Sequence, residues 1–148
     1  MAPMGWLARN IPLPEPHLAG LSIAVAAGWL TGWTLPVPAW ARLAGLGLAL
    51  TGWSLAAWAT WTSRRTLLAH PDQLVRHGPY GRSRNPMYVG WTVAYVGLSV
   101  ALGSAWMLGL LPAVLLFTHL TVRREERHLR ARFGCAYATY ETTVPRYL

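Results

Sequence analysis

Four apolar segments dominate this chain of 148 residues. They cover about 18–35, 40–61, 87–103 and 104–122. Each approaches the roughly 20 residues that a helix needs to cross a hydrocarbon layer of about 30 Å, although the first and third are short. The pattern predicts an all-α membrane protein built as a bundle of about four transmembrane helices.

The composition supports a membrane protein. Hydrophobic residues make up 53% of the chain, charged residues only 12%, and nine residues are tryptophan. This is too apolar and too rich in tryptophan for an ordinary small soluble domain. The net charge of +8 comes without a stacking motif or zinc-ligand set, so anionic lipids or an anionic ligand are favoured over nucleic acid.

Proline and glycine divide the apolar segments into hairpins. Pro36 and Pro38 separate the first two segments, and Gly103-Ser104 makes a minimal turn between the last two, which predicts a tight antiparallel hairpin. Pro112 is expected to kink the last segment or to mark a gap in its packing. We therefore expect one membrane domain, with an N-terminal hairpin (1–62), a loop (63–86) and a second hairpin with its tail (87–148). Small residues expected to allow close helix packing are Gly45, Gly47, Gly52, Gly97 and Gly103.

The arginines predict the orientation in the membrane. All thirteen basic residues are arginine. If the chain crosses four times with both termini inside, twelve arginines lie in the cytoplasm and only Arg42 lies outside, as the positive-inside bias requires. This predicts a multi-pass protein of the inner, cytoplasmic membrane. Expected aromatic belts comprise Trp29, Trp33, Trp40 and Trp106 at the outer interface, and Trp58 and Trp61 at the inner one.

The last helix is expected to continue beyond the membrane. The stretch RREERHLRARFG, from 123 to 134, consists of good helix formers and ends in Gly134, a typical C-terminal cap residue. A short helix over 136–141 is expected to follow. The fold class thus includes a cytoplasmic helical extension at the C-terminus.

Two polar clusters lie at the cytoplasmic ends of the last two membrane helices. Asn85 is expected to cap the third helix and Pro86 to occupy its first turn, where a helix N-terminus favours anions. Carboxylates on the opposite cluster are suited to ribose hydroxyls or an ammonium group. Together they predict a site for a ligand that carries both signs of charge. The clusters are Arg82, Arg84, Asn85 and Tyr88, and Arg123, Arg124, Glu125, Glu126 and His128.

Simpler interpretations apply to the same residues. Arginines beside membrane helices often serve only as lipid anchors, and Glu125-Glu126 among arginines is also typical of a solvated, salt-bridged face. His119 is the one ionisable group deep in a segment, and therefore a candidate, but a packed neutral histidine fits it as well. The single cysteine, Cys135, allows no disulfide framework or thiolate metal site, and no metal site is predicted.

The segments GPYGRSRNPMYVGW and REERHLRARFGCAYATYETTVPR resemble the isoprenylcysteine carboxyl methyltransferase and phospholipid methyltransferase superfamily. The match covers 74–146, in the family's order and spacing. The resemblance implies S-adenosyl-L-methionine as the methyl donor, enclosed by both motifs at the cytoplasmic face. From the two facing clusters we expect catalytic roles for Arg84, Glu126 and Tyr88. The cofactor-binding residues that the resemblance implies are Gly78, Tyr80, Arg84, Asn85, Pro86, Tyr88, Gly90, Glu125, Glu126 and Tyr137. Arg124 is added from its place in the second cluster, where it is expected to orient an anionic group.

One departure from the family pattern concerns the acceptor. Asn85 stands where the isoprenylcysteine enzymes usually have histidine, and asparagine cannot take a proton near neutral pH. A carboxylate or thiolate acceptor needs no general base, whereas an amine must lose a proton, which Glu126 or Tyr88 could accept. The acceptor is expected to be lipophilic or membrane-associated: an isoprenylcysteine carboxylate or a phospholipid amine.

Other functions stay open from the sequence. A small-thiol methyltransferase of the same superfamily is one alternative, and a non-enzymatic scaffold or transporter-like protein is another. The expected partners are the lipidic substrate and membrane lipids, without nucleic acid. Close packing of so small a bundle is also compatible with a homodimer.

Overall fold

The computed structural model describes residues 14–69 and 73–148, and its regular structure is helical. A single antiparallel bridge joins Thr34 to Ser104 within these residues. The elements are α2 (Glu15–Thr31), α3 (Ala39–Ala69), the 3-10 helix η1 (Gly78–Gly81), α4 (Pro86–Leu102), α5 (Ala105–Phe133) and α6 (Cys135–Thr143). The all-α class predicted from the sequence is confirmed.

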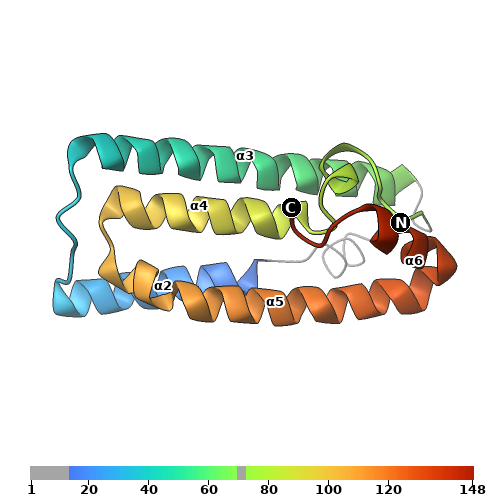
Figure 1. Cartoon of the computed structure of the whole chain (residues 1–148). Helices are drawn as coiled ribbons and strands as arrows, with labels where there is room; N and C mark the ends of the chain where they lie inside the picture. Colours follow the sequence, from blue (N-terminus) through green and yellow to red (C-terminus); the bar gives the residue numbers. More distant parts are fainter. Residues whose placement is uncertain (1–13, 70–72) are drawn as a thin grey trace.

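The four long helices lie side by side in two pairs (Figure 1). Helix α3 packs along α4, and α2 packs along α5. The connections from α2 to α3 and from α4 to α5 lie at one end of the bundle (Figure 1). Helix α6, η1 and the C-terminus gather at the opposite end, which is therefore where segments distant in sequence meet.

Glycine and alanine form the closest helix contact, between α3 and α4. A Cβ atom at Gly45 would lie 2.7 Å from the carbonyl oxygen of Gly97, and one at Gly52 would lie 2.5 Å from that of Gly90. Side chains at these positions would force the backbones apart. The prediction of close packing is confirmed for Gly45, Gly52 and Gly97. It is wrong for Gly47, where an added Cβ would meet no atom of the described residues within 4 Å.

The turn between α4 and α5 forms as predicted. Gly103 ends α4 in the left-handed conformation (φ 60°), which glycine adopts without a steric penalty. Ser104 caps α5, its hydroxyl oxygen accepting a hydrogen bond from the amide of Met107. The prediction that these two helices pack tightly needs correction, because the close contact is between α3 and α4. Tyr95 stands between α4 and α5 and donates to the carbonyl of Met107 (3.2 Å), so large side chains separate this pair.

Helix α5 continues well past its apolar part, as expected. It runs for 29 residues with Pro112 inside it and ends at Gly134 (φ 49°). Helix α6 follows at once and is slightly longer than the 136–141 predicted from the sequence. The extension carries the charged residues of α5 away from the apolar bundle.

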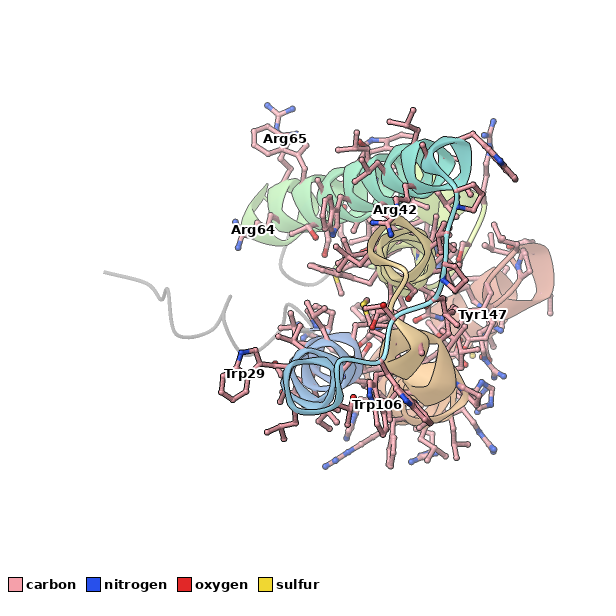
Figure 2. All side chains as sticks on the ribbon, turned by 90° about the vertical axis from the view of Figure 1, so that its left-hand side faces the viewer. Trp29, Arg42, Arg64, Arg65, Trp106 and Tyr147 are labelled. Atoms are coloured by element: carbon pink, nitrogen blue, oxygen red, sulfur yellow. The ribbon has the colours of Figure 1, made fainter. Side chains whose placement is uncertain are left out.

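The apolar surface of the bundle indicates membrane association. The part Ala39–Arg65 of α3 and the whole of α5 are long and apolar enough to span a membrane, and only 28% and 22% of the most apolar stretch of each is buried. Trp29 and Trp40 are 86% and 74% exposed, and Figure 2 shows Trp29 projecting sideways from α2, away from the other helices. Large apolar side chains facing outward in this number are typical of a lipid-facing surface.

Four transmembrane helices are not confirmed. Helices α2 and α4 have 17 residues each, a length of about 26 Å at 1.5 Å per residue, less than the roughly 30 Å of the hydrocarbon core. By length and composition, the described part of the chain contains two helices that qualify as spans. The sequence prediction of four spans included apolar residues that lie beyond the helix ends, such as Trp33 and Leu35 after the end of α2.

Alanine substitutions at two glycines of α3 should test the α3–α4 contact, because they are expected to change the free energy of unfolding in opposite directions. Gly52→Ala should lower the free energy of unfolding by about 1–3 kcal/mol, because its Cβ meets backbone atoms of α4. Gly47→Ala should raise it by about 0.5–1 kcal/mol through helix propensity alone. Thermal unfolding in detergent measures both, and equal effects would contradict the close contact between these helices.

Candidate functional site

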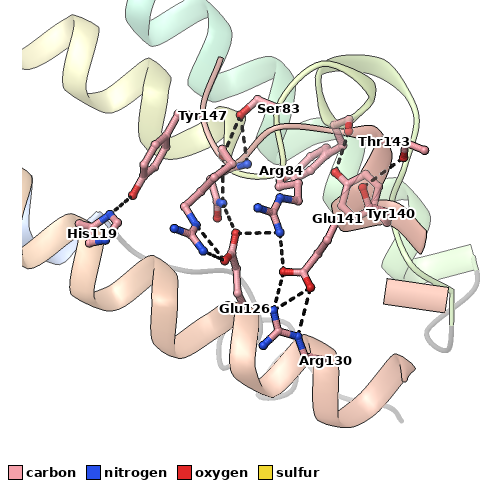
Figure 3. A network of polar contacts seen from close by, with 12 residues as sticks. Ser83, Arg84, His119, Glu126, Arg130, Tyr140, Glu141, Thr143 and Tyr147 are labelled. Carbon is pink, nitrogen blue, oxygen red and sulfur yellow. Dashed lines mark hydrogen bonds and ion pairs between the residues drawn. The ribbon is translucent and has the colours of Figure 1, made fainter. Parts of the chain in front are cut away.

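The buried carboxylate of Glu126 forms the centre of the polar site (Figure 3). Glu126 lies on α5 and is only 3% exposed. Its Oε1 accepts from Asn85 Nδ2 (3.2 Å) and lies 3.5 Å from Arg84 Nη1. Its Oε2 accepts from Nε and Nη2 of Arg146, at 2.9 and 2.8 Å. The start of α4, the charged part of α5 and the C-terminal tail therefore meet at this one side chain.

A second carboxylate, Glu141 on α6, completes the network. Arg84 Nη1 donates to Glu141 Oε1 (2.5 Å), and Arg130 contacts both carboxylate oxygens at 2.7–3.1 Å. Burial alone would raise the pKa of Glu141, but the hydrogen bonds and charges of Arg130 and Arg84 outweigh it and lower that pKa. Arg84 is thus held between Glu126 and Glu141, with its side chain 10% exposed.

The C-terminal tail is fixed by its backbone. The amide of Arg84 donates to the carbonyl of Pro145 (2.9 Å). The carbonyl of Arg146 accepts from Asn85 Nδ2 (3.2 Å) and from the Ser83 hydroxyl (3.3 Å). The tail therefore closes one side of the site.

The tail is also tied to the apolar part of α5. The hydroxyl of Tyr147 lies 2.9 Å from Nδ1 of His119, and Figure 3 shows this pair beside the carboxylate network. His119, the candidate ionisable group of that segment, is therefore engaged with the C-terminus. This contact favours the packed, structural interpretation of His119.

Tyr88 and Glu125 form a separate polar pair. The buried Tyr88 hydroxyl donates to Glu125 Oε1 (2.7 Å). Tyr80 of η1 lies nearby: burial raises its pKa to about 12, and the charge of Glu125 also raises it. Both tyrosines pack with the apolar cluster of Ala56, Met87 and Val122. This pair faces the junction of η1, α4 and α5.

Two buried donors beside the carboxylates, Nε of Arg84 and the hydroxyl of Tyr137, make no hydrogen bond of good geometry within the described residues. They lie close to each other, and Arg84 lowers the pKa of Tyr137, partly offsetting the effect of burial. Tyr137 is 1% exposed, and burial raises its pKa to about 12, so the hydroxyl keeps its proton at neutral pH. A buried donor without an acceptor costs about 1–3 kcal/mol. These donors therefore mark a position suited to an acceptor atom of a ligand or a water.

An open groove of about 320 Å³ lies on the α3–α4 surface. Ala56 and Trp91 line it. Ala56 belongs to the apolar cluster that contains Tyr88, and Trp91 packs against that cluster. Arg64 lies in the last part of the α3 span, toward the end of the bundle that carries the polar site. The groove lining is Trp53, Ala56, Ala57, Thr60, Trp61, Arg64 and Trp91.

The structure brings together most of the residues singled out in the sequence. Arg84 and Asn85 contact Glu126, and Tyr88 contacts Glu125. Tyr137 and Tyr80 lie in the surrounding core. Asn85 begins α4 as predicted, but its side chain does not cap the helix, because its amide is turned toward Glu126.

Other predicted residues do not contribute side chains to the site. Gly90 packs against Gly52 and Ala56 of α3, so its role in this structure is helix packing. Gly78 (φ 61°) and Pro86 shape the backbone of η1 and the first turn of α4. The side chain of Arg124 is exposed on α5. Also exposed are Arg82, Arg123 and His128.

Three residues of the network were not predicted as site residues from the sequence: Arg130, Glu141 and Arg146. The sequence assigned both arginines to membrane orientation. The sequence did contain one signal for Glu141, the scarcity of acidic residues: the chain has only five of them and thirteen arginines. In so basic a chain, an isolated glutamate such as Glu141 is expected to be paired with arginine.

The geometry defines a class: an all-helical, membrane-associated protein with a paired-charge site at one end of its bundle. Residues 40–136 match the family model described as phospholipid methyltransferase. The match covers more than half of the chain, which therefore belongs to the phospholipid methyltransferase family. The resemblance found in the sequence is confirmed, because this family is part of the same superfamily. Membership indicates methyltransferase activity at a membrane. No curated protein and no solved structure matches the chain.

Acid should weaken the fold through Glu141. Its folded-state pKa lies below the ordinary 4.5, so its ionised form stabilises the folded protein above that pH. This contribution is lost as the pH falls from 4.5 through the lower folded-state pKa. Melting temperatures in detergent between neutral pH and about pH 3 should therefore fall less steeply for Glu141→Gln than for the wild type. Glu15→Gln, at an exposed carboxylate, should keep the wild-type slope; equal slopes for all three proteins would contradict the role of Glu141.

Proposed function

We propose that this protein is an integral-membrane methyltransferase that uses S-adenosyl-L-methionine and acts on a lipophilic acceptor, either a phospholipid amine or an isoprenylcysteine carboxylate. The observation that carries the proposal is the meeting of Arg84, Asn85 and Tyr88 with Glu125 and Glu126 at one end of an apolar bundle. Membership in the phospholipid methyltransferase family supports the same activity.

The site's residues suit the chemistry of this cofactor. S-adenosyl-L-methionine supplies a methyl group on a positively charged sulfur, and it also carries a carboxylate, an ammonium group and ribose hydroxyls. The unpartnered Nε of Arg84 and hydroxyl of Tyr137 are donors suited to the carboxylate. Glu126 is the acceptor suited to ammonium or ribose hydroxyls.

The protein's part in the reaction is to position the reactants and exclude water. Asn85 and Arg146 hold the carboxylate of Glu126 in place, and Glu141 does the same for Arg84. Fixed charges in a water-poor site stabilise reacting groups without having to reorganise. Alignment of donor and acceptor by such fixed groups is a main source of rate in methyl transfer.

The groove on α3 and α4 is the proposed binding site for the apolar tail of the acceptor. Trp53, Trp61 and Trp91 provide a wide apolar lining, and Arg64 provides a positive charge. A lipid lying there would reach the end of the bundle that carries the polar site. Arg64 would suit an anionic phosphate of its headgroup.

We further propose that the chain crosses the membrane four times, with the site and both termini on the cytoplasmic side. The support is the sequence position of twelve arginines, which four crossings would put on one side of the membrane. Tilting and local thinning of the bilayer would accommodate the short helices α2 and α4. A homodimer within the membrane is also proposed from the small size of the bundle.

Cofactor binding tests the proposed function directly. Calorimetry on the detergent-purified protein should show saturable binding of S-adenosyl-L-methionine. Glu126→Gln and Arg84→Ala should weaken it by about tenfold to a hundredfold, because each removes a charged hydrogen-bonding partner. Arg124→Ala is the matched control: this exposed arginine of α5 should leave the affinity within about twofold.

Circular dichroism and thermal unfolding should show that each variant is folded. The absence of saturable binding to the folded wild type would overturn the cofactor assignment. If Arg84→Ala and Arg124→Ala lost cofactor affinity equally, the ligand would lie on the outer face of α5 instead.

A further inference from the structure

The carboxylate of Glu126 is surrounded by donors that belong to the chain itself. A carboxylate offers about four positions to hydrogen-bond donors, two on each oxygen. Arg146 takes both positions on Oε2, through Nε at 2.9 Å and Nη2 at 2.8 Å. Oε1 accepts from Asn85 at 3.2 Å and faces Arg84 at 3.5 Å. A ligand that donates to Glu126 must therefore displace one of these side chains.

The three side chains differ in how easily they can leave. Arg84 is also paired with Glu141, and its side chain is only 10% exposed. Asn85 is buried, and its amide also donates to the carbonyl of Arg146. The side chain of Arg146 is 35% exposed, so its guanidinium can return to water at a small desolvation cost. Arg146 is therefore the donor that an incoming group displaces most easily.

The C-terminal tail can stay in place while this side chain moves. The carbonyl of Pro145 accepts from the amide of Arg84 (2.9 Å). The carbonyl of Arg146 accepts from Ser83 (3.3 Å) and from Asn85 (3.2 Å). None of these bonds uses the guanidinium, so a rotation of the Arg146 side chain leaves them intact.

The charges of the network are compatible with such an exchange. Two glutamates and three arginines are paired in it, which leaves one positive charge in excess. When the guanidinium of Arg146 moves away, the remaining charges cancel. The incoming group therefore only has to donate a hydrogen bond to Oε2, and an ammonium group and a ribose hydroxyl both do so.

We propose that Arg146 competes with S-adenosyl-L-methionine for Glu126 and thereby sets the affinity of the site for the cofactor. This inference rests on the proposed methyltransferase function. The guanidinium leaves Oε2 when an ammonium group or a ribose hydroxyl of the cofactor donates to it, and it returns when the cofactor departs. Arg146 thus holds Glu126 until the cofactor has bound, while Asn85 holds Oε1 throughout. The exchange keeps a buried carboxylate paired between turnovers, because an unpaired one is strongly destabilising.

The test measures cofactor affinity in Arg146→Gln by calorimetry. A side chain that covers a site lowers the apparent affinity by the fraction of molecules in which the site is open. The variant should therefore bind S-adenosyl-L-methionine about fivefold to tenfold more tightly than the wild type. S-adenosyl-L-homocysteine, which has the same amino-acid and ribose groups, should gain equally. Arg127→Gln is the matched control: it removes an exposed arginine of α5 and should leave the affinity within about twofold.

A double-mutant cycle shows whether the gain depends on Glu126. In the Glu126→Gln background, Arg146→Gln should bring no gain, because the carboxylate that both donors need is missing. Without cofactor, Arg146→Gln should lower the melting temperature, since Glu126 loses a partner. Saturating cofactor should reduce this deficit, because tighter binding stabilises the folded variant more than the wild type.

Arg146→Lys is a second variant, which keeps the charge and so protects the fold. One ammonium replaces two guanidinium donors, so the affinity for S-adenosyl-L-methionine should rise by about twofold to threefold. A second ligand, 5′-methylthioadenosine, has ribose hydroxyls but no ammonium group. If the gain persists with this ligand, the ribose displaces Arg146; if the gain is lost, the ammonium does. Both outcomes support the exchange.

The inference is overturned if the folded Arg146→Gln and Arg146→Lys proteins bind the cofactor as the wild type does, or more weakly. It is also overturned if the gain persists in the Glu126→Gln background, or if Arg127→Gln gains as much, because loss of positive charge alone would then explain it. If neither the folded wild type nor the folded Arg146 variants bind the cofactor, the proposed function falls, and this inference with it. Binding without a gain overturns the inference alone.

Discussion

The buried carboxylate of Glu126 is the interaction on which the functional end of this molecule depends. Asn85 and Arg84 approach it from the start of α4, and Arg146 approaches it from the tail. Removing one partner of a buried ion pair typically costs about 3–5 kcal/mol, because the other charge stays buried and uncompensated. The three segments therefore hold one another in place, and the site exists only when all of them are assembled.

The position of this network follows from the packing of the apolar helices. Glycine and alanine bring α3 and α4 into backbone contact, whereas Tyr95 and Met107 keep α5 at a greater distance from α4. The wider spacing leaves room at the end of the bundle for polar side chains between α4 and α5. Small residues on one face of α4 and large ones on the other thus determine where a polar site can form.

Local features could be predicted from the sequence, but the choice of helix partners could not. The turn at Gly103 and the end of α5 at Gly134 depend on local backbone conformation, and both were predicted. The tight α3–α4 pair was missed because chain order favours neighbouring helices, while packing follows surface shape. Gly90 illustrates this: the motif that contains it suggested a ligand role, but the structure places it against α3. Glu141 and Arg146 were missed because they meet their partners, Arg84 and Glu126, only after folding.

The family match ends at residue 136, yet the site extends beyond it. Tyr137, Glu141 and Arg146 lie outside the matched region and still provide an unpartnered buried hydroxyl, a carboxylate for Arg84 and the main partner of Glu126. Apart from Tyr137, the groups proposed to act on ligands lie in the matched region, and Glu141 and Arg146 hold Arg84 and Glu126 in position. The tail contacts Glu126, whereas Glu125 accepts a hydrogen bond from Tyr88 of α4. Two adjacent glutamates of one helix are therefore held by different segments of the chain.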